Sequence, residues 1–214
     1  EAAFLKKLIQ ERGHRVILLD TNTGGEPFLP PDISAKEVAK AGGGDIQVIR
    51  KMKDTEKAYR IMIEGAVKKV KGLLEKGELD GIISFGGASN TAVATTIMKS
   101  LPFGIAKVML SSTAAMPAYA GGYFGTKDIA ILHSVVDIAG LNPLVRDVLQ
   151  RAAGMICGMV EMGEGPAILS REKKKGLIAL TEFKFSEECS SRVRHLLEEK
   201  GFGVIPFHAQ GISD

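Results

Sequence analysis

The sequence predicts an α/β fold, namely a doubly wound, mainly parallel sheet followed by the start of a second α/β half-domain. Three observations predict it. Short apolar runs alternate with longer segments of helical periodicity. Glycines stand at most of the boundaries between them. The segments that join successive runs are long enough for the crossovers that parallel strands require, so the strand–helix–strand order indicates parallel pairing.

The helices are marked by apolar spacing and by capping residues. In Asp54–Lys76 apolar side chains recur at helical spacing, which makes this segment the strongest helix. Ser34 and Glu37 have the spacing of a capping box, and Asn142 followed by Pro143 is a typical helix start. The predicted helices are Ala2–Glu11, a short helix from Ser34, Asp54–Lys76, Asn90–Ser100, Asn142–Met162 and Ser186–Lys200.

The strands are predicted at short runs rich in Val, Ile and Leu. They are Arg15–Asp20, Asp80–Phe85, Lys107–Ser111, Ile129–His133, Leu177–Thr181 and Gly203–Phe207. Ala114–Lys127 is predicted to be a glycine-bearing loop and Gly163–Lys175 a linker. These elements predict one half-domain over residues 1–165 and the beginning of a second over 166–214. The chain begins at Glu1 inside a helical pattern, so we expect its true start to lie further upstream.

Composition and charge limit the function classes. The chain has 214 residues, 45% hydrophobic and 25% charged, with a net charge of +3. This charge is too small to indicate a nucleic-acid partner, and the apolar stretches are too short for a membrane span. Cys157 and Cys189 lack CxxC or Cys/His spacing, so neither a disulfide framework nor a zinc site is expected. Free thiols are typical of a cytoplasmic protein.

The best candidate site directly follows the Asp80–Phe85 run. Gly86 and Gly87 allow a tight turn and close approach of the backbone to a ligand. Ser89, Asn90 or Thr91 can then cap the next helix, whose free N–H groups and dipole attract an anion such as phosphate. The segment has neither the lysine of a Walker A loop nor the third glycine of GxGxxG. A plain strand-to-helix turn explains it equally well.

Hydroxyl groups end the next predicted strand. Ser111, Ser112 and Thr113 could hold phosphate oxygens or a magnesium ion, and they are equally good turn formers. In a parallel sheet, ligands bind beyond the carboxyl ends of the strands, so these hydroxyls and the glycine turn are expected to line one crevice.

Three further polar residues have open roles. His133 ends a strand, where a catalytic base could lie, although a lone histidine there is more often structural. His208 follows the last strand and has the same ambiguity. Asp137 could bind a ribose hydroxyl or a metal-bound water, but a turn or cap is the favoured interpretation. No catalytic triad, carboxylate pair or nucleophile elbow is recognisable.

The stretch from Asp80 to Val160 resembles the Tm-1-like ATP-binding domain family, related to a plant tobamovirus-resistance protein. The glycine turn, the run SLPFGIAKV and the run SVVDIAG occur in order at matching spacing. The resemblance implies an amino-terminal domain of two Rossmann-like halves that binds ATP with magnesium and is often a homodimer. It also implies a first strand and an acidic, threonine-bearing loop just before Glu1. The plant protein's viral partner is not carried over.

Residue by residue, the resemblance assigns ligand binding to Gly86, Gly87, Ser89, Asn90 and Thr91, with Ser111, Ser112 and Thr113 as weaker members. The expected function is therefore a nucleotide-binding module for ATP with magnesium. The alternatives are an enzyme acting on a small phosphorylated or carboxylated metabolite in the same crevice, and a structural dimer whose glycines serve packing alone. Ala153, Gly154 and Gly158 in the long helix would suit either tight packing on the sheet or a helix–helix dimer contact.

Overall fold

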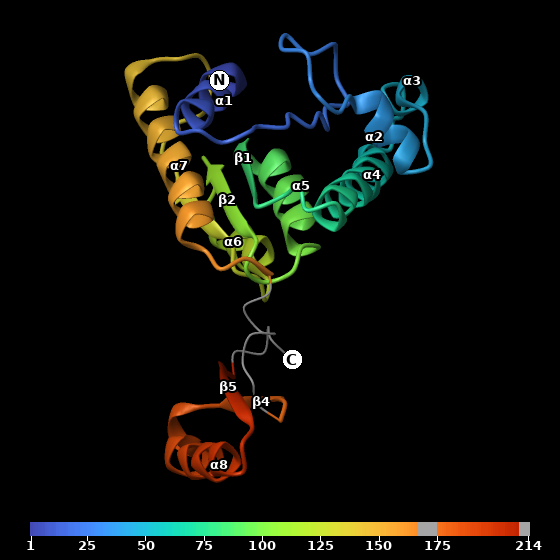
Figure 1. Ribbon diagram of the computed structural model, residues 1–214. Helices are drawn as coiled ribbons and strands as arrows, with labels where there is room; N and C mark the ends of the chain where they lie inside the picture. Colours follow the sequence, from blue (N-terminus) through green and yellow to red (C-terminus); the bar gives the residue numbers. More distant parts are fainter. Residues whose placement is uncertain (167–174, 210–214) are drawn as a thin grey trace. The chain divides into compact units, whose positions relative to one another are not determined.

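The computed structural model describes residues 1–166 and 175–209, which fall in two compact units. Unit 1 is Glu1–Gly165 and unit 2 is Pro166–Asp214 (Figure 1). Part of the predicted linker Gly163–Lys175 lies outside the described residues.

Unit 1 is built on a parallel sheet of β1 (Gly81–Gly86), β2 (Ala106–Ser111) and β3 (Ala130–His133) in sequential order. These strands confirm the three predicted from Asp80 to His133. The central strand β2 is buried along its whole length, because it has a paired strand on both sides and helices on both faces. The sequence-predicted α/β fold with parallel strands is thus confirmed.

Helices cover both faces of this sheet, as the doubly wound arrangement requires (Figure 1). Helix α7 packs against one face and α5 against the other, with α6 beside α5. Helix α1 packs on α7, while α4 packs on α5 and carries α2. The helices of unit 1 are α1 (Ala2–Glu11), α2 (Ala35–Ala41), α3 (Ile46–Ile49), α4 (Thr55–Glu75), α5 (Ala88–Lys99), α6 (Pro117–Phe124) and α7 (Pro143–Met162).

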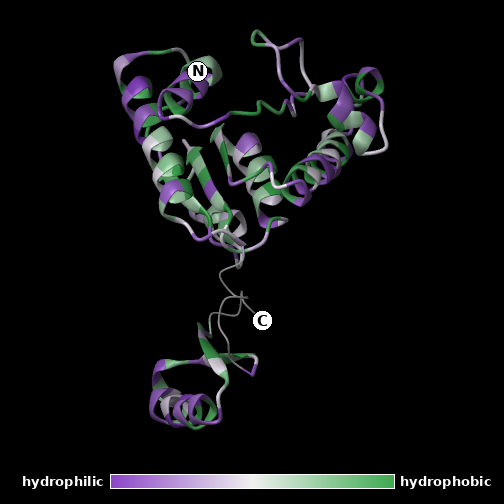
Figure 2. Ribbon diagram, in the orientation of Figure 1, coloured by the Kyte–Doolittle hydropathy of each residue, from purple (hydrophilic) through white to green (hydrophobic). Residues whose placement is uncertain are grey.

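The core of unit 1 consists of separate apolar layers on the two faces. The layer beneath α7 includes Val108, Leu110 and Leu149, and the layer around α4 includes Met62 and Leu101. Figure 2 shows the strands mostly in green, the colour of hydrophobic residues, whereas the outer helices alternate between green and purple. This alternation is the periodicity that predicted the helices from the sequence.

Two predicted helix starts are confirmed in detail. The Ser34 side chain accepts a hydrogen bond from the Glu37 backbone N–H, and the Glu37 carboxylate accepts one from the Ser34 N–H, which completes the capping box. Asn142 accepts a hydrogen bond from the Val145 N–H at the start of α7, with Pro143 at the first helical position.

Two predicted elements are wrong. Arg15–Asp20 forms no strand, since its sole β interaction is an isolated parallel bridge between Leu19 and Ile33. An apolar run becomes a strand when a neighbouring strand offers a ladder of hydrogen bonds, and the described residues offer one bridge here. Within Ala114–Lys127, predicted as a loop, residues Pro117–Phe124 form α6, because proline suits a first helical position and tertiary contacts outweigh the two glycines.

Packing of α7 against the sheet does not require the glycines of this helix. A Cβ atom added at Gly154 or Gly158 would meet no atom within 4 Å. Ala153, by contrast, is buried. Tight packing on the sheet therefore does not explain these two glycines, and the helix–helix dimer contact stays a prediction.

A polar cluster that we call the clasp joins the end of α1 to the end of α7. The Glu161 carboxylate accepts hydrogen bonds from Arg12 at 3.0 and 3.1 Å and lies 3.0 Å from Nε2 of His14. The hydrogen bond with His14, followed by those from Arg12, lowers the pKa of the Glu161 carboxyl below its ordinary value. The clasp thus holds two helices that are remote in sequence.

A buried lysine fixes the end of the sheet at which the strands begin. Lys107 is fully buried, and its ammonium donates to the carbonyl oxygens of Pro102 (2.7 Å) and Ile105 (2.9 Å) and to the Asp128 carboxylate (2.7 Å). All three ammonium protons are therefore used. Asp128 also accepts from the Gly104 N–H, so the ion pair ties the loop before β2 to the start of β3.

Unit 2 contains a βαβ arrangement. Strands β4 (Leu177–Glu182) and β5 (Gly203–His208) pair in parallel, and α8 (Glu187–Glu199) connects them after a short 3₁₀ turn at Lys184–Ser186. The two strands and the helix confirm the predicted elements of this region. Within residues 1–166 and 175–209, no helix has the length and apolar character needed to cross a bilayer.

Candidate functional site

The carboxyl ends of three parallel strands form the candidate site. Gly86, Ser111 and His133 are direct partners in the register of β1, β2 and β3, so they lie side by side at one edge. Helix α5 begins at this edge immediately after β1. The structure therefore brings the predicted glycine turn and the predicted hydroxyl cluster together. This is the edge at which parallel α/β sheets bind ligands.

The two glycines of the turn have different structural roles. Gly86 has φ +151°, and a Cβ atom there would lie 2.7 Å from Cβ of Asn90, so the position requires glycine. Gly87 has φ −86°, and its nearest neighbour would be Oγ of Ser112 at an ordinary 3.7 Å. Gly86 thus makes the tight turn, whereas Gly87 keeps the approach to the helix open.

The cap predicted from the sequence is wrong in one respect. Gly87 is the N-cap, and α5 begins at Ala88 without a side-chain cap. Ser89, Asn90 and Thr91 lie inside the first turn, because a glycine N-cap needs no side chain and lets the helix start earlier. Among the described residues, the N–H groups of Ala88, Ser89 and Asn90 have no hydrogen-bond acceptor.

Four hydroxyl groups, which we call the hydroxyl chain, connect α6 to this turn. The Tyr123 hydroxyl lies 3.1 Å from Oγ1 of Thr113, which lies 3.2 Å from Oγ of Ser111. Ser111 Oγ lies 2.8 Å from Oγ1 of Thr91, and Thr91 donates to the Gly87 carbonyl at 2.8 Å.

The direction of the hydroxyl chain follows from the one proton that each hydroxyl carries. Thr91 uses its proton on the carbonyl oxygen of Gly87, so Ser111 donates to Thr91. Ser111 then has no proton for Thr113, so Thr113 donates to Ser111. By the same reasoning Tyr123 donates to Thr113. Thr91 and Ser111 are fully buried, so their hydroxyls hold β2 against α5 and are closed to solvent.

The predicted site residues therefore divide into two groups. Thr91 and Ser111 support the turn from inside. Gly87, Ser89 and Asn90 are exposed at the first turn of α5, and Ser112 and Thr113 are partly buried beside it. The Ser112 N–H donates to the Gly86 carbonyl at 3.1 Å, which holds the loop after β2 near the glycine turn. The exposed group is the one that a ligand can reach.

His133 ends β3 at this edge, and a strained segment follows it. Nδ1 of His133 lies 3.3 Å from the Ser111 carbonyl oxygen, and the imidazole is exposed. Val135 has φ +65°, an unfavourable conformation for a β-branched residue. The Ser134 hydroxyl donates a hydrogen bond to the Val136 carbonyl at 2.6 Å, which spans the strained residue.

A model of the domain described as "Uncharacterised protein family (UPF0261) N-terminal domain" matches residues 1–165. The chain belongs to the UPF0261 family. It is similar to a UPF0261 protein of Clostridium tetani, with 37% identity over 99% of this chain and 51% of the relative. A UPF0261 protein of Brucella suis is 32% identical over 99% of this chain and 50% of its own length. The UPF0261 chain thus spans about half the length of these curated relatives.

A plant protein is also among the relatives. The tomato "ToMV resistance protein Tm-1(GCR237)" of Solanum lycopersicum is 32% identical over 64% of this UPF0261 chain and 18% of its own length. The resemblance to Tm-1-like proteins that the sequence suggested is therefore confirmed.

The structure shows no ligand set around the remaining polar candidates within the described residues. Asp137 is exposed beyond β3. His208 belongs to unit 2, where its ring lies 5.8 Å from the Phe183 ring. Over the described ranges, no three His, Cys, Asp or Glu residues gather to form a metal-binding group.

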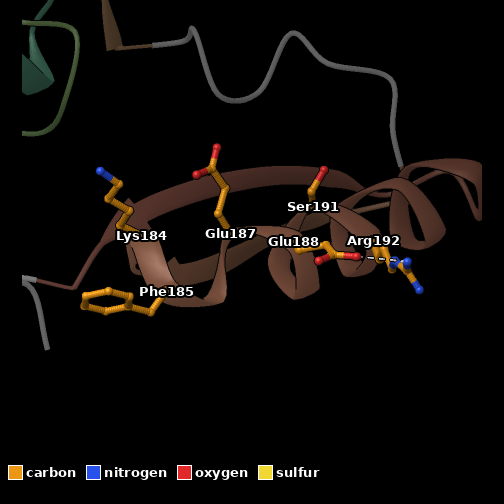
Figure 3. A pocket seen from close by; sticks show the side chains of 6 residues that line it. All are labelled: Lys184, Phe185, Glu187, Glu188, Ser191 and Arg192. Atoms are coloured by element: carbon orange, nitrogen blue, oxygen red, sulfur yellow. Dashed lines mark hydrogen bonds and ion pairs between the residues drawn. The ribbon is translucent and has the colours of Figure 1, made fainter.

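The UPF0261 chain also has a shallow surface depression on unit 2 (Figure 3). It is lined by Lys184, Phe185, Glu187, Glu188, Ser191 and Arg192. These side chains project outward in different directions, and Glu188 and Arg192 pair with each other at 3.0 Å. Because no polar groups converge, the depression has the character of a solvated helix surface.

Sequence reasoning missed Tyr123. The residue is buried and ends the hydroxyl chain, yet it lies in a segment predicted as a loop. The sequence carries no local signal for this role, because the partner of a hydroxyl is set by how α6 packs beside α5.

Proposed function

We propose that unit 1 of this UPF0261 chain binds a nucleotide, ATP with magnesium, through its phosphate groups at the first turn of α5. One observation carries the proposal. The first three N–H groups of α5 lie at the ligand-binding edge of a parallel sheet and have neither a side-chain cap nor another acceptor in the described residues. Unpaired helix N–H groups and the positive end of the helix dipole favour an anion.

The surroundings of this turn support a phosphate group. Gly87 is exposed and has no side chain to block an approach to the amides. The exposed side chains of Ser89 and Asn90 supply further neutral donors. No carboxylate belongs to the first turn, so no negative charge opposes a phosphate there.

ATP is the nucleotide, and magnesium the ion, that the family resemblance implies. Magnesium is usually held by phosphate oxygens and water with few protein ligands, so binding of this ion does not require a large acidic cluster. The half-buried hydroxyl of Ser112 beside Gly87 would be the protein oxygen for this ion. Bound magnesium would offset the negative charge of the phosphates.

A thermal-shift measurement on the whole chain tests the proposal. ATP, ADP and pyrophosphate are added with and without magnesium, and a ligand at 100 times its Kd should stabilise the protein by about 2.7 kcal/mol. The matched variants are Ser89→Asp and Ser89→Asn. The aspartate should stabilise the free protein by about 0.3–1 kcal/mol through the helix dipole and should greatly reduce the ligand shift.

The control is Ser89→Asn, whose side chain has the shape of aspartate without its charge, and it should keep the ligand shift. An equal ATP shift in wild type and Ser89→Asp would refute the site, and no shift with any of these ligands would refute the function. A phosphate-release assay on the same samples separates a binding module from the enzyme alternative.

A further inference from the structure

His133 presents one unused nitrogen at the candidate site. Nδ1 lies 3.3 Å from the carbonyl oxygen of Ser111, and a carbonyl oxygen can only accept a hydrogen bond. In the neutral imidazole Nδ1 therefore carries the proton and Nε2 carries a lone pair. Over residues 1–166 and 175–209, Nε2 has no hydrogen-bond partner.

The imidazole lies on the same face of the sheet as the first turn of α5. Side chains alternate between faces along a strand. Leu132 packs in the layer beneath α7, whereas Ile131 and Met109 pack in the layer beneath α5. His133 and Ser111 are each two residues further along, so both belong to the α5 face.

The strand register sets the distance from the phosphate position. Gly86 pairs with Ser111, and Ser111 pairs with His133. Neighbouring strands are about 4.8 Å apart, so His133 lies about 10 Å from the glycine turn. A ligand whose phosphate binds at α5 would place a different chemical group beside the imidazole.

We propose that Nε2 of His133 accepts a hydrogen bond from a sugar hydroxyl of the phosphorylated ligand. The inference rests on the proposed function, because the phosphate position at α5 orients the ligand. A lone pair requires a donor, which a hydroxyl provides and an ionised phosphate does not. The residue thus selects ribonucleotides or sugar phosphates over inorganic polyphosphate and over deoxy analogues.

Two substitutions separate this role from a structural one. Asparagine can place its amide nitrogen near the position of Nδ1 and so keep the hydrogen bond to Ser111, but it has no acceptor at the Nε2 position. Glutamine can place its amide oxygen near the position of Nε2, but it has no nitrogen near the position of Nδ1 to donate to Ser111. His133→Asn should therefore lose the ligand hydroxyl, whereas His133→Gln should keep it.

The experiment is calorimetric titration of the whole chain with three probes, each with magnesium: ATP, 2′,3′-dideoxy-ATP and inorganic triphosphate. In wild type, ATP should bind about 2- to 10-fold more tightly than the dideoxy analogue, the effect of one neutral hydrogen bond. In His133→Asn that difference should vanish while triphosphate binding is unchanged. In His133→Gln most of it should remain.

Three results would overturn the inference, and they point to different faults. An ATP preference that persists in His133→Asn excludes a role in reading the hydroxyl. Equal weakening of all three probes in His133→Gln, with binding by His133→Asn unchanged, assigns His133 to support of the loop through its hydrogen bond to Ser111. If wild type binds none of the probes, the proposed function fails and the inference fails with it.

Discussion

Alanine substitutions at Gly86 and Gly87 should have very different effects on stability, although the two residues are adjacent. At Gly86, φ of +151° is a conformation that costs an L-residue about 1–3 kcal/mol. The new Cβ would also lie 2.7 Å from Cβ of Asn90, and overpacking of this kind costs about 1–3 kcal/mol more. Gly86→Ala should therefore destabilise unit 1 by about 2–6 kcal/mol.

At Gly87 the same change meets no obstacle. Its φ of −86° suits alanine, and the added Cβ would be 3.7 Å from Oγ of Ser112. Replacing a favourable N-cap residue destabilises the fold, whereas the lower entropy of the unfolded chain stabilises it. These effects largely offset each other, so the free energy of unfolding should change by no more than about 1 kcal/mol. The added methyl group at an exposed position beside the free amides should nevertheless weaken ATP binding.

The chain offers a selective assay for this comparison. It has three tyrosines and no tryptophan, and Tyr59, Tyr119 and Tyr123 all lie in unit 1. Tyrosine emission during thermal unfolding therefore follows unit 1 alone. Gly86→Ala should lower Tm by roughly 5–15 °C and Gly87→Ala by roughly 3 °C or less. Equal shifts in the two variants would refute the assignment of the turn to Gly86.

Three further predictions concern residues outside the turn and use urea unfolding followed by tyrosine emission. Glu161→Gln should lower the free energy of unfolding at neutral pH, and its difference from wild type should shrink below about pH 4.3. The reason is that a carboxyl with a lowered pKa stabilises the fold above its ordinary pKa, and this stabilisation is lost as the carboxyl becomes protonated. An equal difference in stability at pH 7 and pH 3 would contradict this. Lys107→Met leaves the partly exposed Asp128 carboxylate unpaired and should cost about 2–4 kcal/mol, whereas a loss below 1 kcal/mol would show that the pair is dispensable. Val135→Asn should stabilise unit 1 by about 1 kcal/mol, since asparagine tolerates a positive φ and residue 135 is 77% exposed. A loss of stability would contradict backbone strain at this position.

Much of unit 1 was predictable because its elements carry local signals. The helix α4 and the caps at Ser34 and Asn142 depend on spacing and side-chain chemistry within a few residues. The strands β1 to β3 are apolar runs bounded by glycine or by polar residues. The glycine turn was recognisable for the same reason, since Gly86 and Gly87 directly follow an apolar run.

The errors arise where structure depends on partners that are distant in sequence. The run Arg15–Asp20 is as apolar as a strand, yet its pairing is limited to one bridge at Leu19. Helix α6 holds a buried tyrosine against the end of β2, which outweighs the low helix propensity of its glycines. The division of the hydroxyl residues into a buried pair and an accessible group likewise depends on how α5 packs, not on local sequence.

The fixed direction of the hydroxyl chain has a consequence for the peptide bond between Gly87 and Ala88. Its carbonyl oxygen accepts two hydrogen bonds from Thr91, one from the backbone N–H at 2.9 Å and one from the hydroxyl at 2.8 Å. Both draw electron density through the conjugated amide toward oxygen, and the chain from Tyr123 polarises the second. The Ala88 N–H at the other end of this amide becomes more acidic and a stronger donor, so a phenol on α6 adjusts the electronics of the first amide of α5.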